Sequence, residues 1–292
     1  MGAVVLVLIP LLCAPSLSIT SLVFGPMRGV GFLQRDLPMS SLPNRIKFVG
    51  RVHPAGTKIT GSAPDVTFVE GTGAFKAIFN VRIVDSAIDI QCDFDNALPD
   101  HPYHLWAQAQ EICQTFVNVI AFQLGAGTVI VLDRWINERG ETNDISFADP
   151  ALPPLCTVFK GHDFNQITRI IFAEPGLFVA LNDIVLANAM PRHVLINCAR
   201  CVEALRHLLA SSGTDRNQAW ATMRQTLNVD QAYLTFITQH SVEPRHGRHT
   251  EVGNAAIPEV RARTWTLMNR FLYYRLHNNQ PLPLNEFPLL VG

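Results

Sequence analysis

The chain has 292 residues, of which 48% are hydrophobic and 16% are charged. This composition excludes an intrinsically disordered protein, and the length suffices for one large domain or two smaller ones. The formal net charge of −1 excludes a whole-molecule field that would recruit nucleic acid or an anionic membrane. A polyanion would therefore have to bind a local patch.

Residues 1–27 form an apolar leader. Residues 3–14 contain no charged side chain; this run is too short to span a bilayer but has the length of a signal-peptide core. No lysine or arginine precedes Arg28, so the positive region of a signal peptide is missing, and Met27 or Met39 is an alternative start. We expect a cytoplasmic protein, with export through this leader as the alternative and membrane association not favoured.

Residues 28–154 are predicted to form a β-rich α+β domain. Hydrophobic residues alternate with polar or small ones from residue 75 to 83 and again from 88 to 94. Asp85 and Ser86 lie between the two runs as a turn. The pattern predicts an antiparallel hairpin with one buried face.

One helix accompanies these strands. Apolar residues fall on one helix face between residues 103 and 124, and Gly125 closes the helix. Residues 128–136 return to a strand pattern. The proline-rich segment 149–154 has the composition of a linker, so we place a domain boundary after residue 154.

Residues 155–292 are predicted to form an α-helical bundle with a proline-rich C-terminal tail. Helical spacing of apolar residues recurs in a series of stretches: 163–172, 176–190, 191–211, a segment capped by Thr214 and Asp215, 229–240, and a last helix that begins at Pro258. Prolines exclude a helix after residue 280, and we expect the leucines and Phe287 of the tail to lie across the bundle surface. The fold class is α+β: a mainly antiparallel β region with one packed helix, followed by the bundle.

The six cysteines follow no disulfide framework, which favours thiols in a reducing compartment. Cys198 and Cys201 have the spacing of a redox or zinc motif, but they continue an apolar helix stripe with Val202 and Leu205. We therefore predict buried structural thiols rather than a reactive or metal-binding pair.

Residues 240–249, His-Ser-Val-Glu-Pro-Arg-His-Gly-Arg-His, concentrate three histidines and two arginines between two predicted helices. We call this segment the histidine loop. Loops on a rigid scaffold hold functional side chains more often than core elements do. This segment is therefore the first place to expect chemistry.

The histidine loop has three interpretations. His240, His246 and His249, with Glu243, are ligand types that suit zinc or iron, but ligand pairs four residues apart on a helix are absent, so we predict no metal and no cofactor. A second interpretation is a loop that its arginine and histidines pin through hydrogen bonds to backbone carbonyls.

The third interpretation is an anion site. Arg245 and Arg248 flank Gly247, whose backbone can approach a phosphate closely, just before the helix at Pro258. His246 or His249 would then serve as general acid or base in a metal-free cleavage of RNA.

The C-terminal half, about residues 160–280, resembles the HEPN superfamily. The resemblance rests on a helical bundle and on Arg245-His246-Gly247 in a loop before a long helix. It implies a bundle whose active relatives are metal-independent, commonly dimeric ribonucleases and whose inactive relatives are binding or scaffold modules. Residues 265–275 and the end of the tail also resemble uncharacterised bacterial proteins, which implies no function.

HEPN proteins separate a functional arginine and histidine by four to six residues. Arg245 and His249 are separated by three. Arg200 and His207, and Arg270 and His277, are each separated by six, which places each pair on one helix face. Two such pairs are about the number that chance would give for 19 arginines and 10 histidines.

The hypothesis that we carry forward is a HEPN-like binding or interaction module with a phosphate- or nucleotide-binding corner at Arg245, Gly247 and Arg248. Its expected partner is RNA or a nucleotide-bearing ligand, and a homodimer is the expected assembly. A ribonuclease using His246 and His249 is the first alternative, and an enzyme is the less favoured class. A metal-binding protein is the second alternative.

Overall fold

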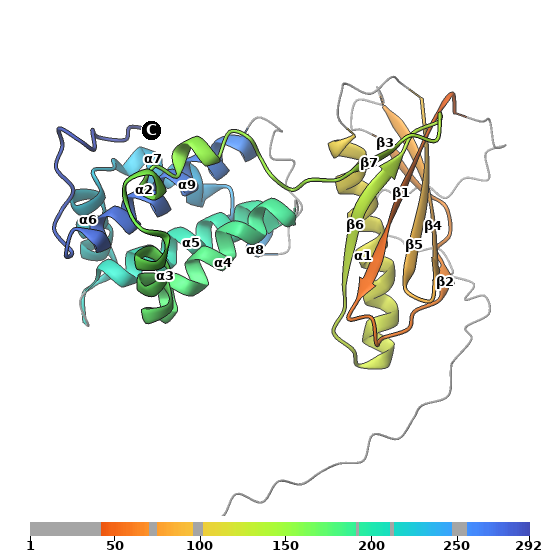
Figure 1. The fold of residues 1–292 in the computed structure, drawn as a ribbon, viewed down its shortest axis with the longest axis horizontal. Helices are drawn as coiled ribbons and strands as arrows, with labels where there is room; N and C mark the ends of the chain where they lie inside the picture. Colours follow the sequence, from red (N-terminus) through yellow and green to blue (C-terminus); the bar gives the residue numbers. More distant parts are fainter. Residues whose placement is uncertain (1–41, 70–74, 96–101, 191–192, 211–212, 247–255) are drawn as a thin grey trace, which may run out of the picture. The chain divides into compact units, whose positions relative to one another are not determined.

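The computed structural model describes residues 42–69, 75–95, 102–190, 193–210, 213–246 and 256–292. The chain divides into two compact units, Met1–Ser146 and Phe147–Gly292 (Figure 1). The division falls eight residues before the boundary that we placed after residue 154. The proline-rich segment belongs to the second unit, because Arg261 Nη2 lies 2.7 Å from the carboxylate of Asp149. The leader at residues 1–27 lies outside the described residues.

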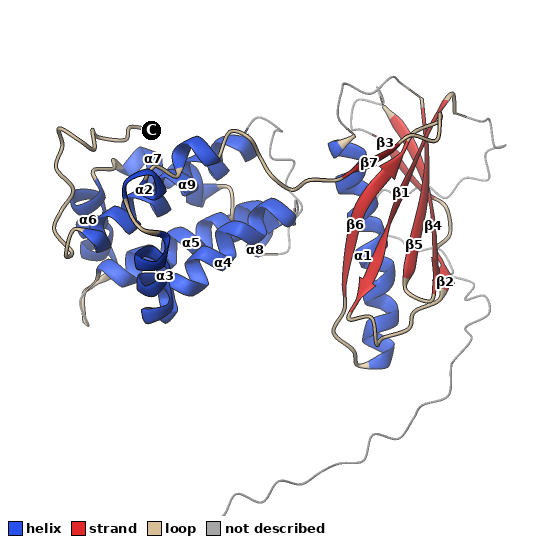
Figure 2. Cartoon of the chain, in the orientation of Figure 1, coloured by secondary structure: helices blue, strands red, loops and turns tan. Residues whose placement is uncertain are grey.

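The first unit contains a seven-stranded sheet in the order β2-β4-β5-β1-β6-β7, with β3 also paired to β4 (Figure 2). The strands are β1 Asn44–His53, β2 Gly61–Ser62, β3 Val66–Val69, β4 Lys76–Val84, β5 Ala87–Phe94, β6 Val129–Ile136 and β7 Thr142–Asp144. Neighbouring strands pair antiparallel throughout. The predicted hairpin is confirmed as β4 and β5, joined at Asp85 and Ser86, both with positive φ.

The sheet buries one face against helix α1, Tyr103–Leu124. The alternating hydrophobic residues of β4 and β5 are the buried ones, as the period-two pattern requires. The helix ends at Gly125, which adopts φ 62°, so the predicted bounds of this helix are confirmed. The opposite sheet face carries ion pairs, including Arg45 with Asp93 at 2.6 Å.

The second unit is helical, which confirms the predicted α+β class. Its elements are the 3-10 turn η1 Pro153–Leu155 and helices α2 Val158–Gly161, α3 Phe164–Ala173, α4 Pro175–Ala189, α5 Val194–Leu209, α6 Arg216–Leu227, α7 Gln231–Gln239, α8 Val242–Arg245 and α9 Ala256–Leu276. The carboxylate of Asp215 caps α6 by accepting from the backbone N–H groups of Asn217 and Gln218.

Several helix bounds differ from the prediction: the helix predicted over 191–211 spans Val194–Leu209, and the stretch predicted over 229–240 spans Gln231–Gln239. The last helix is described from Ala256, not from Pro258, because a proline without an N–H is tolerated in a first helical turn. The histidine loop is not all loop, since Val242–Arg245 forms one helical turn despite Pro244.

Helix α5 supplies much of the core of the second unit. Cys198 and Cys201 are fully buried among apolar side chains, and burial raises the pKa of the Cys198 thiol to about 11. Burial raises the pKa of Cys201 well above its ordinary value. Both residues are free cysteines, so the predicted structural thiols are confirmed and neither is a nucleophile at neutral pH.

A buried guanidinium holds the tail. Arg270 on α9 is 6% exposed and donates to the carbonyl oxygens of Leu227 and Asn228, both at 2.8 Å, and of Pro288 at 2.7 Å. Burial lowers its pKa. Arg270 thereby joins α9, the end of α6 and the tail.

The tail packs less completely than we expected. Leu282 is buried and Phe287 is partly buried against the core, whereas Leu284 and Leu289 are exposed. The amide of Asn228 donates to the carbonyl oxygens of Leu282 and Phe287, which fixes these two positions.

No single helix in the described part of the chain is long and apolar enough to cross a membrane. Helices α3 and α4, which are bent by 112° at their junction, satisfy the length and composition criterion only when they are taken together.

Replacing Gly50 should destabilise the first unit. Gly50 lies at the irregularity in the β1–β6 register, and a Cβ there would overlap the Val131 carbonyl oxygen and lie 2.8 Å from Leu132 Cα. We expect Gly50→Ala to lower the free energy of unfolding of this unit by about 1–3 kcal/mol, measured by hydrogen exchange of its amides in increasing urea. Gly127→Ala is the control, because a Cβ at Gly127 meets nothing within 4 Å. Equal effects of the two substitutions would contradict the packing argument.

Removing the buried guanidinium should loosen the tail. Arg270→Met leaves the Leu227, Asn228 and Pro288 carbonyl oxygens without this donor, and we expect a loss of about 3 kcal/mol in the free energy of unfolding. Urea denaturation followed by helical circular dichroism measures the loss, and limited proteolysis after residue 280 should accelerate. The exposed Arg169 on α3 provides the control, Arg169→Met. A tail equally resistant to protease in both variants would contradict the role of Arg270.

Candidate anion site in the helical unit

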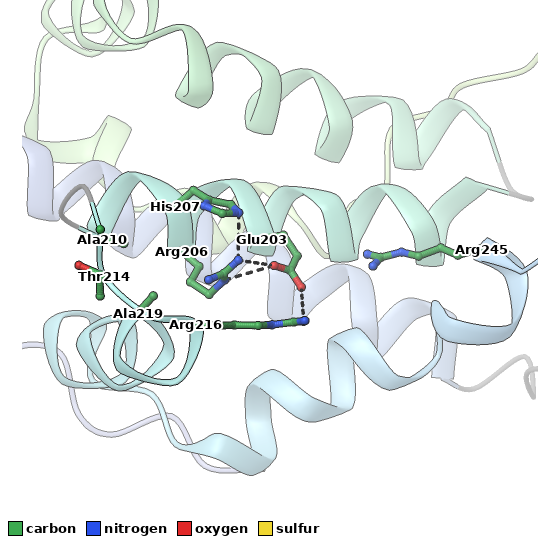
Figure 3. Close-up of a pocket in the computed structure, with 9 residues that line it drawn as sticks. Glu203, Arg206, His207, Ala210, Thr214, Arg216, Ala219 and Arg245 are labelled. Atoms are coloured by element: carbon green, nitrogen blue, oxygen red, sulfur yellow. Dashed lines mark hydrogen bonds and ion pairs between the residues drawn. The ribbon is translucent and has the colours of Figure 1, made fainter.

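A pocket of about 660 Å³ opens at the end of α5 (Figure 3). Its walls come from α5, the segment before α6, the first turns of α6, and the last residue of α8. The lining residues are Glu203, Arg206, His207, Ala210, Gly213, Thr214, Arg216, Ala219 and Arg245. Three arginines from distant parts of the chain therefore share one pocket with a single carboxylate.

Glu203 organises two of these arginines. Its Oε2 accepts from Arg206 Nη2 at 2.8 Å and from Arg206 Nε at 3.2 Å, while its Oε1 accepts from Arg216 Nη2 at 3.3 Å. The Arg206 guanidinium also lies over the Trp220 ring, 5.1 Å from its centroid. Arg206 is buried and held in place, whereas the Arg216 side chain is 72% exposed and keeps a single, longer bond.

Arg245 completes the charged lining. Its side chain extends from α8 toward Glu203 and Arg216 (Figure 3). Within the described residues, no carboxylate lies within ion-pair distance of its guanidinium. With three guanidinium groups facing one carboxylate, the pocket lining has an excess of two positive charges when His207 is neutral.

His207 is held in one tautomer. Its Nε2 lies 2.9 Å from Arg206 Nη2. A guanidinium has no acceptor, so Nε2 must accept and the imidazole proton must lie on Nδ1. The Nε2 lone pair of His207 is therefore engaged by Arg206 rather than free to accept a proton from a substrate.

The start of α6 adds little to anion binding. The carboxylate of Asp215 already accepts from the N–H groups of Asn217 at 2.8 Å and Gln218 at 3.2 Å. These amides are not available to a ligand. Recognition in this pocket depends on the arginine side chains.

The structure places only one of the predicted site residues in the pocket. Arg245 lines the pocket, but the exposed His246 is not among the lining residues. The backbone N–H of His246 donates to the carbonyl oxygens of Val242 and Glu243. Gly247, Arg248 and His249 lie outside the described residues.

The pinning interpretation gains no support at Arg245 from the residues that the structure describes. Its backbone N–H donates to the Ser241 carbonyl oxygen at 3.1 Å as part of the α8 turn. The Ser241 hydroxyl donates to the Thr238 carbonyl oxygen at 2.7 Å. Among the described contacts, the loop is held by backbone and serine bonds, and the Arg245 guanidinium makes no bond to a carbonyl.

The two arginine–histidine pairs of HEPN spacing have different roles. Arg270 is committed to buried carbonyls, so the pair with His277 is not available to a ligand. Arg200 lies 3.3 Å from the carboxylate of Asp183 and does not line the pocket. Of the pair Arg200 and His207, only His207 lines the pocket, where it lies next to Arg206.

Three pocket residues, Glu203, Arg206 and Arg216, were not predicted from the sequence. The spacing of Glu203 and Arg206 is that of an ion pair on one helix face, which could have been found. Their proximity to Arg216 and Arg245 depends on how α5, α6 and α8 pack.

The metal interpretation gains no support from the described residues, in which no group of three or more histidine, cysteine, aspartate or glutamate side chains could hold a metal ion. Of the predicted ligands, His240 packs edge-on against Phe236, with ring centroids 5.2 Å apart. His249 lies outside the described residues.

Comparison with known proteins identifies a family without an assigned activity. Residues 46–145 match the N-terminal domain, and residues 164–276 the C-terminal domain, of the domain of unknown function DUF8168. No curated protein and no solved structure matches the chain. The two family models correspond to the two structural units and together cover more than two thirds of the sequence, so the chain belongs to the DUF8168 family.

Proposed function

We propose that the helical unit is a HEPN-like ligand-binding module whose arginine-lined pocket binds a phosphate-bearing small molecule of nucleotide size. The observation that carries this proposal is the convergence of Arg206, Arg216 and Arg245 on one pocket with one carboxylate. Guanidinium groups bind phosphate through paired N–H donors, and a pocket of about 660 Å³ is in the range of small-molecule sites.

The three arginines would have different roles in binding, because one is held in place and two are exposed. Arg206 is fixed by Glu203 and Trp220, so it loses little side-chain entropy when a ligand binds. Arg216 and Arg245 are exposed and can close on a phosphate from two other elements. A bound phosphate would take the place of Glu203 as the partner of Arg216, whose present bond is 3.3 Å long.

Binding is better supported than RNA cleavage. The ribonuclease alternative needs a histidine that exchanges a proton at the phosphate. Within the described residues, His246 does not line the pocket. His207 does, but its Nε2 lone pair, which a general base would need, accepts from Arg206.

Loss of either exposed arginine should weaken binding. We expect pyrophosphate and adenosine monophosphate to bind the wild-type chain, and Arg245→Gln and Arg216→Gln each to raise the dissociation constant about tenfold, since a charge-assisted bond contributes about 1.5–3 kcal/mol. Isothermal titration calorimetry measures this. Arg224→Gln, on α6 but outside the pocket, is the matched control and should bind as wild type. Failure of the wild-type chain to bind either ligand, or equal effects at all three arginines, would overturn the proposal.

Removing the pocket carboxylate should have the opposite effect. Glu203→Gln deletes the negative charge that competes with a phosphate for Arg216, so pyrophosphate affinity should rise severalfold and should fall with added salt. The same calorimetry at two salt concentrations measures both. An unchanged circular dichroism spectrum would confirm that the bundle remains folded. Weaker binding by the folded variant would contradict the role of Glu203 as a competitor.

A further inference from the structure

Helix α4 is apolar on two opposite faces. Leu177, Ala180, Ile184 and Ala187 are buried in the core of the unit, at 0% or 1% exposure. On the other face, Phe178, Val179, Val185 and Leu186 are between 43% and 51% exposed. A helix that is hydrophobic around its circumference is normally covered on every side. Within the described residues of the helical unit, nothing covers the second face.

The exposed face also lacks charge. The only ionisable side chain within α4 is Asp183, which is 6% exposed and pairs with Arg200. Phe172, 70% exposed at the end of α3, extends the apolar surface and packs against Phe178 with ring centroids 5.9 Å apart. A solvent-facing helix of a soluble domain ordinarily carries charged residues on this side.

The four exposed residues are arranged symmetrically about the exposed Asn182. Val179 and Val185 lie three positions before and after it, and Phe178 and Leu186 lie four positions before and after it. A stripe with this spacing is self-complementary when a second copy runs antiparallel across it. Val179 of one copy then meets Val185 of the other, and Phe178 meets Leu186, twice over.

We propose that two copies of this chain form a homodimer through α4, with the helices antiparallel and a two-fold axis at Asn182. The two Asn182 amides, each with donors and an acceptor, can pair at the axis and fix the register, as a polar residue does within an apolar helix seam. This interface is separate from the arginine-lined pocket, and the proposal does not rest on ligand binding.

A second copy fits this face better than a lipid surface does. Helices that lie in a membrane interface carry lysine or arginine on the face opposite their apolar side. Helix α4 contains neither, and Glu174 stands just before it. Symmetry about Asn182 has no role in lipid binding, whereas a two-fold interface requires it.

The interface is small. A helix of 15 residues is about 22 Å long. The surface area that one face of α4 and Phe172 would bury is therefore at the lower end of the range for specific protein–protein interfaces. We expect dimer and monomer to exchange at micromolar protein concentration. Sedimentation velocity of the full chain over about a hundredfold range of concentration should show the mass rise from monomer to dimer.

Charge substitutions test the antiparallel arrangement. Val185→Arg and Val179→Glu, both at exposed positions, should each keep the chain monomeric over the whole range. The double variant Val179→Glu/Val185→Arg places opposite charges across the axis twice and should restore the dimer. In a parallel pair, like charges would meet and the double variant would remain monomeric. Val119→Arg, at an equally exposed apolar position on α1, is the control and should dimerise as wild type.

Three results would overturn the proposal. One is a wild-type chain that stays monomeric throughout. Another is a dimer that Val185→Arg leaves intact while the helical circular dichroism is unchanged. The third is a monomeric wild-type chain that sediments with phosphatidylcholine vesicles and loses this property in Val185→Arg, which would assign the face to lipid.

Discussion

A guanidinium group that is taken out of water must be given acceptors, and this requirement organises the second unit. Arg270 meets it with three backbone carbonyls, which fix the end of α6 and the tail around α9. Arg206 meets it with Glu203 and the imidazole of His207. The Arg270 guanidinium bonds only to buried backbone carbonyls, so Arg270 has a structural role. Arg206, in contrast, is held by Glu203, whose carboxylate lines a pocket.

The pocket follows from that difference. Glu203 holds Arg206 tightly and Arg216 loosely, and Arg245 reaches the same space from α8 without a carboxylate partner among the described residues. A chain with a net charge of −1 thus concentrates positive charge at one place, where side chains from separate elements converge. Because Asp215 occupies the first amides of α6, the site depends on side chains rather than on a helix end.

Local patterns predicted most of the architecture. Alternation in β4 and β5 identified the buried sheet face, because only one face of this sheet packs against α1. Gly125 marked the end of α1 because its positive φ suits a residue without a side chain. The start of α9 was misplaced because proline is compatible with several positions in a first turn.

The candidate site could be predicted only in part. Arg245 was identified from its neighbours, but Arg206 is 39 positions away, and their convergence depends on packing among α5, α6 and α8. A period of three and four identified α4 as a helix, yet it could not show which apolar face remains uncovered. The pocket and the exposed face of α4 both depend on contacts between elements that are distant in the sequence, and such contacts leave no pattern in the local sequence.

The most direct test of the pocket follows its arginines individually. Pyrophosphate is titrated into the full chain labelled with nitrogen-15 at arginine, and the Nε–H signals are recorded by nuclear magnetic resonance. If the pocket binds phosphate, the signals of Arg206, Arg216 and Arg245 shift together with one dissociation constant while that of Arg270 stays in place. Shifts spread over arginines outside the pocket, such as Arg169 and Arg224, with unrelated dissociation constants would contradict it.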